Sequence, residues 1–246
     1  MFVHGNPETA AVWAPLIAEL ARTDVVTLSP PGFGAKVPDG FGATADEYLD
    51  WLVTELEAIG EPVDLVGHDW GANHVMRLAC RRPDLLRSWC ADTAGAWAPD
   101  YEWHEVSRWF RTPGTGEKVI DAWLAMGASG RREIFQPAGV APEVVAVMAE
   151  AVDEEMGRCI LALYRSADEA AFASWRELLP AASARPGLVL AAVADTYTGT
   201  ESQHRWTAER MGAQVVVLPA LGHWWMLEEP GTAAEALQRF WRQVRP

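Results

Sequence analysis

The sequence predicts a doubly wound α/β fold that carries one inserted helical segment. Short apolar runs without polar alternation recur along the chain, at residues 25–28, 63–66, 89–91, 188–193 and 215–218. Runs of this kind are typical of strands that are buried on both faces of a parallel sheet. Helical patterns lie between them, and this alternation indicates a mostly parallel sheet with helices on both faces.

Three of the intervening helices are expected to begin with a capping box. In this motif a hydroxyl side chain and an acidic or amide side chain three residues later satisfy free backbone N–H groups at the helix start. The three matches are Thr44-x-x-Glu47, Thr200-x-x-Gln203 and Thr232-x-x-Glu235.

The helical insertion is predicted at residues 98–180. This stretch contains several helical patterns but no convincing strand, and its Trp and Met content is too apolar for a linker. We therefore expect a helical cap at 98–180 and an α/β core that combines residues 1–97 and 181–246. Only Met1, Phe2 and Val3 precede the first turn, so the N-terminal strands of the sheet are expected to be shortened or missing.

Composition narrows the classes of partner. A chain of 246 residues, half of them hydrophobic, can bury the core of one large domain. Its net charge of −14 disfavours nucleic acid and anionic membranes as partners. The three cysteines, Cys80, Cys90 and Cys159, form no metal-binding spacing and are expected to be buried thiols. With no secretion signal and no long apolar run, we expect a cytoplasmic protein.

Gly67 and Gly71 flank Asp69 directly after the apolar run at residues 63–66. In isolation, such a pattern is more often a turn with an N-capping Asp. After a buried strand it also fits a nucleophile elbow, in which small neighbours allow a tight strand-to-helix turn that exposes one side chain.

The order of residues downstream favours the elbow. Asp195 follows one predicted strand and His223 follows the next, so Asp69, Asp195 and His223 occur in the order nucleophile, acid, histidine. Asp92, after the run at 89–91, is an alternative acid. Upstream, the turn His4-Gly5-Asn6-Pro7 is placed to supply an oxyanion-hole amide.

These motifs also carry a family resemblance, through His4-Gly5-Asn6-Pro7, Gly67-His68-Asp69-Trp70-Gly71-Ala72, Asp195 and Gly222-His223-Trp224. Together they resemble the branch of the α/β-hydrolase superfamily that contains epoxide hydrolases and haloalkane dehalogenases. The resemblance implies that Asp69 forms a covalent alkyl ester, that His223 activates water, and that Asp195 orients His223. The backbone amides of Asn6 and Trp70 are expected to form the oxyanion hole. An anionic Asp can displace a leaving group from saturated carbon directly, whereas an esterase or hydroxynitrile lyase usually needs Ser at this position.

Two leaving groups fit this machinery. An epoxide oxygen needs a proton donor, and the resemblance assigns this role to Tyr164, with Tyr101 as a further substrate-binding tyrosine. Trp97 and other tryptophans of the cap are expected to line an apolar pocket. A halide needs N–H donors, for which Asn6 and Trp70 resemble the halide-binding pair of one dehalogenase subgroup.

We therefore predict an epoxide hydrolase that converts apolar epoxides to diols, with haloalkane dehalogenase as the alternative. A third possibility, from another class, is a ligand-binding protein of hydrolase descent whose catalysis is incidental. The expected partners are a small apolar substrate and water, with no cofactor and no metal. The sequence does not predict the oligomeric state.

Overall fold

A single parallel sheet forms the centre of the molecule. The computed structural model describes residues 1–135 and 141–244. Its six strands lie in the order β2-β1-β3-β4-β5-β6, and each neighbouring pair is parallel. Their bounds are β1 (Phe2–Val3), β2 (Thr27–Leu28), β3 (Val63–Gly67), β4 (Leu86–Ala91), β5 (Gly187–Ala192) and β6 (Gln214–Leu218).

Every apolar run predicted as a strand overlaps one of these strands. All residues of β3 and β5 are buried, as expected for strands covered on both faces. The first strand, β1, is only two residues long. The predicted fold class is confirmed.

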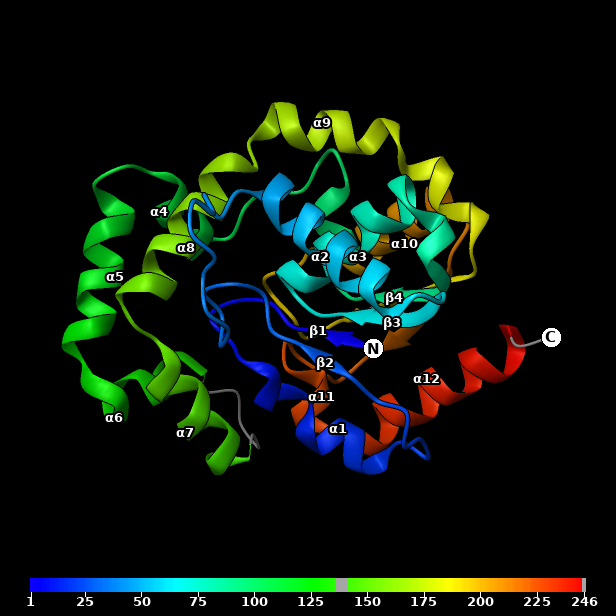
Figure 1. Cartoon of the computed structure of the whole chain (residues 1–246), viewed down its shortest axis with the longest axis horizontal. Coiled ribbons are helices and arrows are strands. Elements are labelled where there is room, and N and C mark those ends of the chain that lie inside the picture. The colour runs from blue at the N-terminus through cyan, green and yellow to red at the C-terminus, as the bar shows by residue number, and fades with distance from the viewer. Residues whose placement is uncertain (136–140, 245–246) are drawn as a thin grey trace.

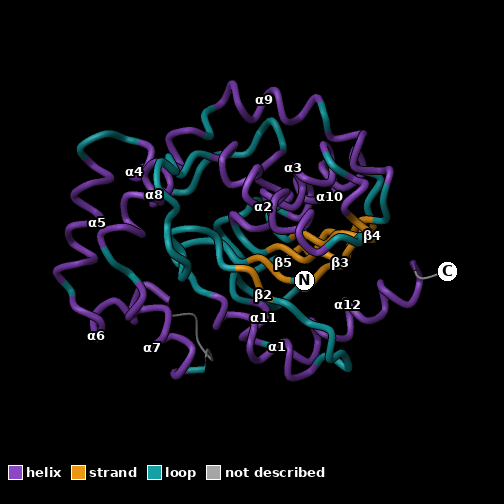
Figure 2. Tube along the Cα trace, viewed as in Figure 1, coloured by secondary structure: helices purple, strands orange, loops and turns teal. Residues whose placement is uncertain are grey.

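Helices cover both faces of the sheet. In Figure 1, α2, α3 and α10 lie above the strands, whereas α1, α11 and α12 lie below them. Figure 2 shows the strands enclosed between these two helical layers. The bounds are α1 (Ala14–Glu19), α2 (Ala45–Ile59), α3 (Trp70–Arg81), α10 (Glu201–Met211), α11 (Trp225–Glu228) and α12 (Pro230–Val244), with short 3-10 helices η1 (Ala10–Trp13) and η2 (Pro83–Leu85).

Two of the three predicted capping boxes are confirmed. Thr44 caps α2 together with Glu47, and Thr200 caps α10 together with Gln203. The third prediction is wrong, because α12 begins at Pro230 and Thr232 already lies within the helix. Proline suits a first helical position because its ring fixes φ and it has no N–H to satisfy.

The chain between β4 and β5 is helical, and its described residues contribute no strand to the sheet. Residues 136–140 of the predicted cap lie outside the described part of the chain. Helices α4 to α8 gather at one side of the molecule, on the left in Figure 1. The elements are η3 (Ala94–Trp97), α4 (Glu105–Arg111), α5 (Thr115–Ala125), α6 (Gly127–Arg131), η4 (Arg132–Phe135), α7 (Pro142–Ala151), α8 (Glu154–Ser166), α9 (Glu169–Glu177) and η5 (Leu179–Ala184).

The strand order creates a crevice at the centre of the sheet. β1 lies between β2 and β3, so the connections that leave β1 and β3 diverge toward opposite edges. Such a switch point opens a crevice beyond the carboxyl ends of the strands, where ligands bind in open α/β sheets. Val3 pairs with Gly67, and the backbone N–H of His68 donates to the Val3 carbonyl. The turn after Val3 and the turn after Gly67 therefore lie side by side.

Two further features bear on the sequence predictions. All three cysteines are buried and unpaired, as expected. None of the described helices combines the length and the apolar character that a membrane span requires.

His74 makes the core sensitive to pH. It lies on α3, is 1% exposed, and stacks on Tyr48 with ring centroids 5.2 Å apart. Its Nδ1 has no hydrogen-bond partner among the described residues. Burial, together with the nearby Arg77, lowers the pKa of His74 to about 3. Below pH 6.5 the unfolded chain therefore binds a proton at His74, whereas the folded protein keeps His74 neutral down to about pH 3. The free energy of unfolding consequently falls as the pH falls.

We predict that His74→Leu weakens this pH dependence. Between pH 7.5 and 5.0, protonation of a normal histidine in the unfolded chain costs about 2 kcal/mol of stability when the folded form stays neutral. The fall in unfolding free energy over this range should shrink by that amount in the variant, as measured by urea denaturation. Met76→Leu, on the same buried helix, should keep the wild-type dependence. An unchanged dependence in His74→Leu would contradict the prediction.

Candidate active site

Asp69 occupies a strained turn between β3 and α3. Its φ of 50° and ψ of −124° are rarely adopted by residues other than glycine. Hydrogen bonds hold this backbone on both sides. The Asp69 N–H donates to Asp92 Oδ1 at 3.1 Å, and the Asp69 carbonyl accepts from Thr93 Oγ1 at 3.2 Å and from the Asn73 N–H at 3.2 Å. These contacts thus stabilise a backbone conformation that is unfavourable for an aspartate on its own.

The flanking glycines are sterically required. A Cβ on Gly67 would lie 2.5 Å from Cα of Ala72, and a Cβ on Gly71 would lie 2.3 Å from the Val3 carbonyl oxygen. The same holds for Gly5, where a Cβ would lie 2.1 Å from Asp69 Oδ1. The turn after β1 therefore passes directly against the Asp69 carboxylate.

Asp69, His223 and Asp195 meet at the carboxyl ends of the strands. His223, in the loop after β6, places Nε2 3.9 Å from Asp69 Oδ2. Its Nδ1 lies 2.8 Å from Oδ2 of Asp195, in the loop after β5. Asp195 is itself held by the backbone N–H of Tyr197 at 2.7 Å and by Thr198 Oγ1 at 3.0 Å. When the ring of His223 is neutral and Nδ1 donates to Asp195, the unprotonated Nε2 faces Asp69.

The charges of these groups depend on one another. Burial opposes ionisation of Asp195, but the adjacent His223 outweighs it and lowers the pKa of Asp195 to about 2. Burial also opposes the charged form of His223, and the Asp195 carboxylate reverses this and raises the pKa of His223. Burial raises the pKa of Asp69, against the attraction of His223 and His68.

One of the two predicted oxyanion donors contacts the Asp69 carboxylate, and the other lies at the start of the following helix. The Asn6 N–H donates to Asp69 Oδ1 at 3.0 Å. Trp70 is the first residue of α3, so its N–H is one of the four at the helix start without an intrahelical acceptor. The positive end of this helix dipole also favours negative charge here.

A cavity of about 240 Å³ opens above Asp69. It lies between the core and the helices that follow β4. Its core residues are Asn6, Pro7, Asp69, Tyr197, His223 and Trp224, and its other residues are His104, Val106, Phe110, Trp123, Ile134 and Tyr164. Most of the lining is apolar or aromatic, which suits a small apolar molecule that approaches the carboxylate.

Only some of the predicted substrate contacts line this cavity. Tyr164, on α8, does so and is 5% exposed. Tyr101 is not among the lining residues, and its hydroxyl donates to the Tyr197 carbonyl at 2.6 Å. Trp97 is fully buried away from the cavity, and its Nε1 donates to Asn73 Oδ1 at 2.6 Å. Its rings pack against Phe172 and Trp175, so Trp97 supports the fold beneath the site.

Tyr164 and Trp70 interact directly. Their rings meet edge to face, with centroids 5.2 Å apart. Burial and the charge of Asp69 raise the pKa of Tyr164 well above its ordinary value. The phenol is therefore protonated at neutral pH.

Glu8, His68 and Asp92 form a buried chain of charges beneath the site. His68 Nδ1 lies 2.5 Å from Asp92 Oδ2, and His68 Nε2 lies 2.9 Å from Glu8 Oε1. Burial would lower the pKa of His68, but the two carboxylates raise it well above the ordinary value. His68 is thus an imidazolium between two carboxylates. Asp92, the alternative acid, is paired with His68, and Asp195 is the acid that contacts His223.

This charge chain also holds the loop of His223. Trp224 Nε1 donates to Glu8 Oε1 at 2.6 Å, and Trp225 Nε1 donates to Asp92 Oδ2 at 2.7 Å. Glu8 Oε2 also accepts from the Gly5 N–H at 3.4 Å. Glu8 and Asp92 therefore connect the turn after β1, the elbow and the histidine loop.

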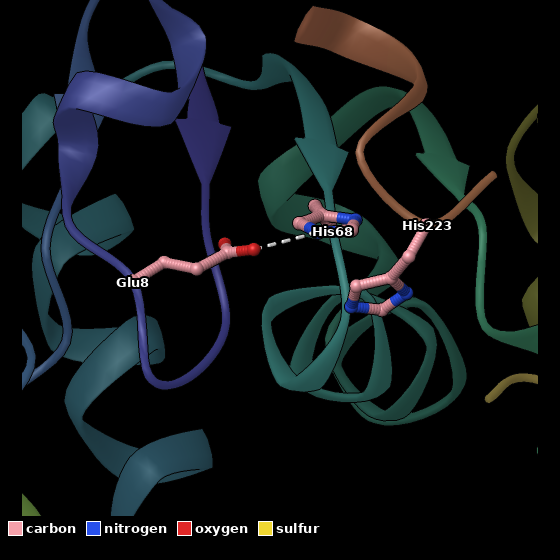
Figure 3. A group of neighbouring side chains, drawn as sticks. All are labelled: Glu8, His68 and His223. Carbon is pink, nitrogen blue, oxygen red and sulfur yellow. Dashed lines mark hydrogen bonds and ion pairs between the residues drawn. The ribbon is translucent and has the colours of Figure 1, made fainter. Parts of the chain in front are cut away.

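Glu8, His68 and His223 also lie close enough to be considered as metal ligands, with one potential ligand atom each within 4.8 Å of the others (Figure 3). Figure 3 shows the Glu8 carboxylate directed at His68, with the ring of His223 beside them. Both nitrogens of His68 are already engaged by carboxylates, and His223 Nδ1 is engaged by Asp195. These hydrogen bonds explain why the three side chains lie close together: they belong to a network of ion pairs.

Sequence reasoning did not single out Glu8, His104 or Tyr197 as site residues. The only sequence feature that points to Glu8 is its position directly after the turn of residues 4–7. An acidic residue at such a position is not expected to be completely buried. His104 precedes an acidic first turn, which is compatible with an N-cap. Neither pattern indicates a cavity, because the cavity forms from segments far apart in sequence.

A comparison with protein families identifies the chain. The sequence model described as "Alpha/beta hydrolase family" matches residues 1–236. The chain belongs to the alpha/beta hydrolase family. The predicted superfamily membership is thereby confirmed, and hydrolase chemistry is supported.

Individual relatives are more distant. An epoxide hydrolase from Caballeronia sordidicola is 30% identical over 101 residues, which cover 36% of this chain and 28% of that protein. A haloalkane dehalogenase from Mesorhizobium japonicum is 27% identical over 139 residues, covering 49% of this chain and 42% of that protein. The matches thus span less than half of these relatives. A crystal structure of a haloalkane dehalogenase loop variant from Bradyrhizobium elkanii is similar in fold, with a TM-score of 0.72, 20% identity, and coverage of 100% of this chain and 90% of that one.

We predict that Glu8→Gln destabilises the protein by about 3 kcal/mol, because breaking a buried ion pair leaves its partner uncompensated. The charge of His68 lowers the pKa of Glu8 to about 2 despite burial. The ionised Glu8 therefore contributes fully to the free energy of unfolding above pH 4.5, and this contribution is lost as the pH falls toward 2. The measurement is therefore urea unfolding at pH 7. The exposed Glu19→Gln variant should change stability by less than about 0.5 kcal/mol. Equal stabilities of the two variants would refute the structural role of Glu8.

Proposed function

We propose that this protein is a hydrolase that opens small apolar epoxides to diols through a covalent ester on Asp69. The observation that carries the proposal is the position of the Asp69 carboxylate. It lies on the wall of an apolar cavity, within reach of His223, and the buried Tyr164 hydroxyl group belongs to the same cavity. An aspartate at this turn is anionic without a base, so it can attack a saturated carbon directly.

The two oxygens of Asp69 are suited to different tasks. Oδ1 accepts the Asn6 N–H and is held in the oxyanion hole before the reaction begins. Oδ2 is the free oxygen and is assigned as the nucleophile. When Oδ2 becomes the ester oxygen, Oδ1 becomes the ester carbonyl oxygen and is already placed for the second step.

Ring opening requires a proton. As Oδ2 forms its bond to carbon, the epoxide C–O bond breaks and the electron pair passes to the departing oxygen. Tyr164 donates its proton to that oxygen, giving an ester with a free hydroxyl group and a tyrosinate. The Trp70 ring meets the Tyr164 ring edge to face and helps to hold the tyrosine at the cavity.

Hydrolysis of the ester then uses the histidine. His223 Nε2 takes a proton from water, and the resulting hydroxide adds to the Asp69 carbonyl carbon. The oxyanion on Oδ1 is stabilised by the amides of Asn6 and Trp70, each of which is typically worth about 3 to 4 kcal/mol of barrier. On collapse, the departing diol oxygen takes the proton from His223. The proton remaining on the Asp69 carboxyl group returns to Tyr164 through water.

Tyr164 favours an epoxide over a halide as the leaving group. It lines the cavity of Asp69, and its phenol can donate a proton to a departing epoxide oxygen, whereas a halide ion leaves without one.

Haloalkane dehalogenation is the second candidate, and one observation favours it. Asn6 Nδ2 is a buried donor without a hydrogen-bond partner among the described residues, and Asn6 lines the cavity. A halide ion at this amide would satisfy the donor. We place this reading second because it assigns no role to Tyr164.

The helices between β4 and β5 are proposed to act as a cap that closes the cavity and determines substrate size. A cavity of about 240 Å³ corresponds to roughly eight water molecules at about 30 Å³ each. Styrene oxide is a suitable probe because it is apolar and has nine non-hydrogen atoms, about the number that such a cavity admits.

Isotope labelling tests the covalent step. With enzyme in excess over styrene oxide in heavy-oxygen water, the diol of the first turnover should be free of label, because its new oxygen comes from Asp69. The label should appear in the Asp69 peptide, as measured by mass spectrometry. Label in the first diol and none in Asp69 would show direct attack by water.

A parallel assay with 1-bromobutane separates the alternatives. Bromide release without diol formation would favour the dehalogenase, and Asn6→Ala should then abolish that release. Binding of both probes without turnover of either would favour a ligand-binding protein. Diol formation that survives in Asn6→Ala, without bromide release, supports the epoxide proposal.

A further inference from the structure

We propose that His104 is a second catalytic donor, which binds the departing oxygen through its Nε2–H group while Tyr164 transfers the proton. This inference rests on the proposed function, because an N–H donor at this position acts on an oxygen that leaves carbon. It assigns a task to the one histidine that lines the cavity besides His223.

The position of His104 is fixed by two contacts. It is the N-cap residue of α4, and it lines the same cavity as Asp69 and Tyr164. Its ring packs edge to face against Tyr197 with centroids 4.9 Å apart, and Tyr197 packs in the same way against His223 at 5.1 Å. His104 and His223 thus both pack against one aromatic ring at the cavity wall.

The helix cap determines which nitrogen of His104 carries hydrogen. Nδ1 accepts the backbone N–H of Ser107 at 3.3 Å, and Ser107 Oγ donates to the His104 carbonyl at 2.6 Å. A ring nitrogen that accepts from an N–H group has no hydrogen of its own, so the neutral ring carries its proton on Nε2. The fold therefore sets Nε2 as a donor without any need for a carboxylate partner.

His104 is a neutral donor at neutral pH. Burial lowers the pKa of His104 to about 4, and His223 in its protonated form lowers it further in the same direction. A neutral N–H group can stabilise a developing alkoxide without adding a positive charge to the cavity. In the reaction His104 keeps its proton, so the proton balance through Tyr164 and Asp69 is unchanged.

The other candidates are less suited to this task. The hydroxyl of Tyr101 is committed to the Tyr197 carbonyl. Tyr197 lines the cavity but is 38% exposed, so water competes for its hydroxyl group.

His104→Asn tests the donor separately from the helix cap. Asparagine is a good N-cap residue, so the variant should keep α4 capped, but its side chain is too short to replace the imidazole in the cavity. We expect the rate of ester formation from styrene oxide in single turnover to fall about 100-fold, as for the loss of one oxyanion donor. The rate of ester hydrolysis should stay near the wild-type value, because His223 and the oxyanion hole are intact.

Asp168→Asn is the matched control. Asp168 caps α9 through the Ala171 N–H, does not line the cavity, and should keep the wild-type rate after the same kind of replacement. If wild-type protein opens epoxides and His104→Asn forms the ester as fast, the role of His104 is refuted while the proposed function stands. If wild-type protein forms neither diol nor ester, the proposed function and this inference both fail.

Nitrogen NMR of the wild-type protein provides a test that needs no variant. The His104 ring should show a protonated Nε2 and an unprotonated Nδ1 at pH 7. Benzamide, whose carbonyl oxygen resembles the departing oxygen as an acceptor, should shift the Nε2 signal on binding. Protonation on Nδ1, or a fully protonated ring at pH 7, would overturn the proposal.

Discussion

The buried ion chain of Glu8, His68 and Asp92 is the constraint on which the site depends. An imidazolium removed from water is costly unless carboxylates compensate it, and here one carboxylate contacts each ring nitrogen. The remaining carboxylate lone pairs accept hydrogen bonds from the Asp69 backbone and from the indoles of Trp224 and Trp225. Because each group is satisfied only when all are in place, the loops after β1, β3, β4 and β6 are fixed together.

This shared framework explains how the proposed nucleophile can occupy a strained backbone conformation. Asp69 adopts a positive φ, which costs free energy. That cost is offset by the hydrogen bond from its N–H to Asp92 and by the hydrogen bond that its carbonyl accepts from Thr93. The same framework aligns the Asn6 amide with Oδ1 and His223 with Oδ2. Little rearrangement is then needed when charge develops, which is the condition for strong electrostatic stabilisation.

Much of this arrangement could be predicted from local patterns. Buried parallel strands are continuous apolar runs, the glycines around Asp69 mark a tight turn, and two hydroxyl-initiated helix starts follow a local hydrogen-bonding rule. Asp69, Asp195 and His223 each follow a predicted parallel strand, so all three could be expected at the edge of the sheet where the strands end. Features that depend on distant segments could not be predicted: the burial of Glu8, the direction of the Tyr101 hydroxyl, and the cavity position of His104. The start of α12 was predicted wrongly. The capping pattern predicted a helix start at Thr232, whereas the helix begins two residues earlier at Pro230.

The central claim is that Asp69 itself becomes bonded to substrate carbon. The most direct test is to remove the group that activates water, with His223→Gln, and to incubate this variant with styrene oxide. The ester can then form but not hydrolyse, so the intact protein should gain the mass of one styrene oxide, located on the peptide that contains Asp69. An unmodified protein that still produces diol at the wild-type rate would contradict the account.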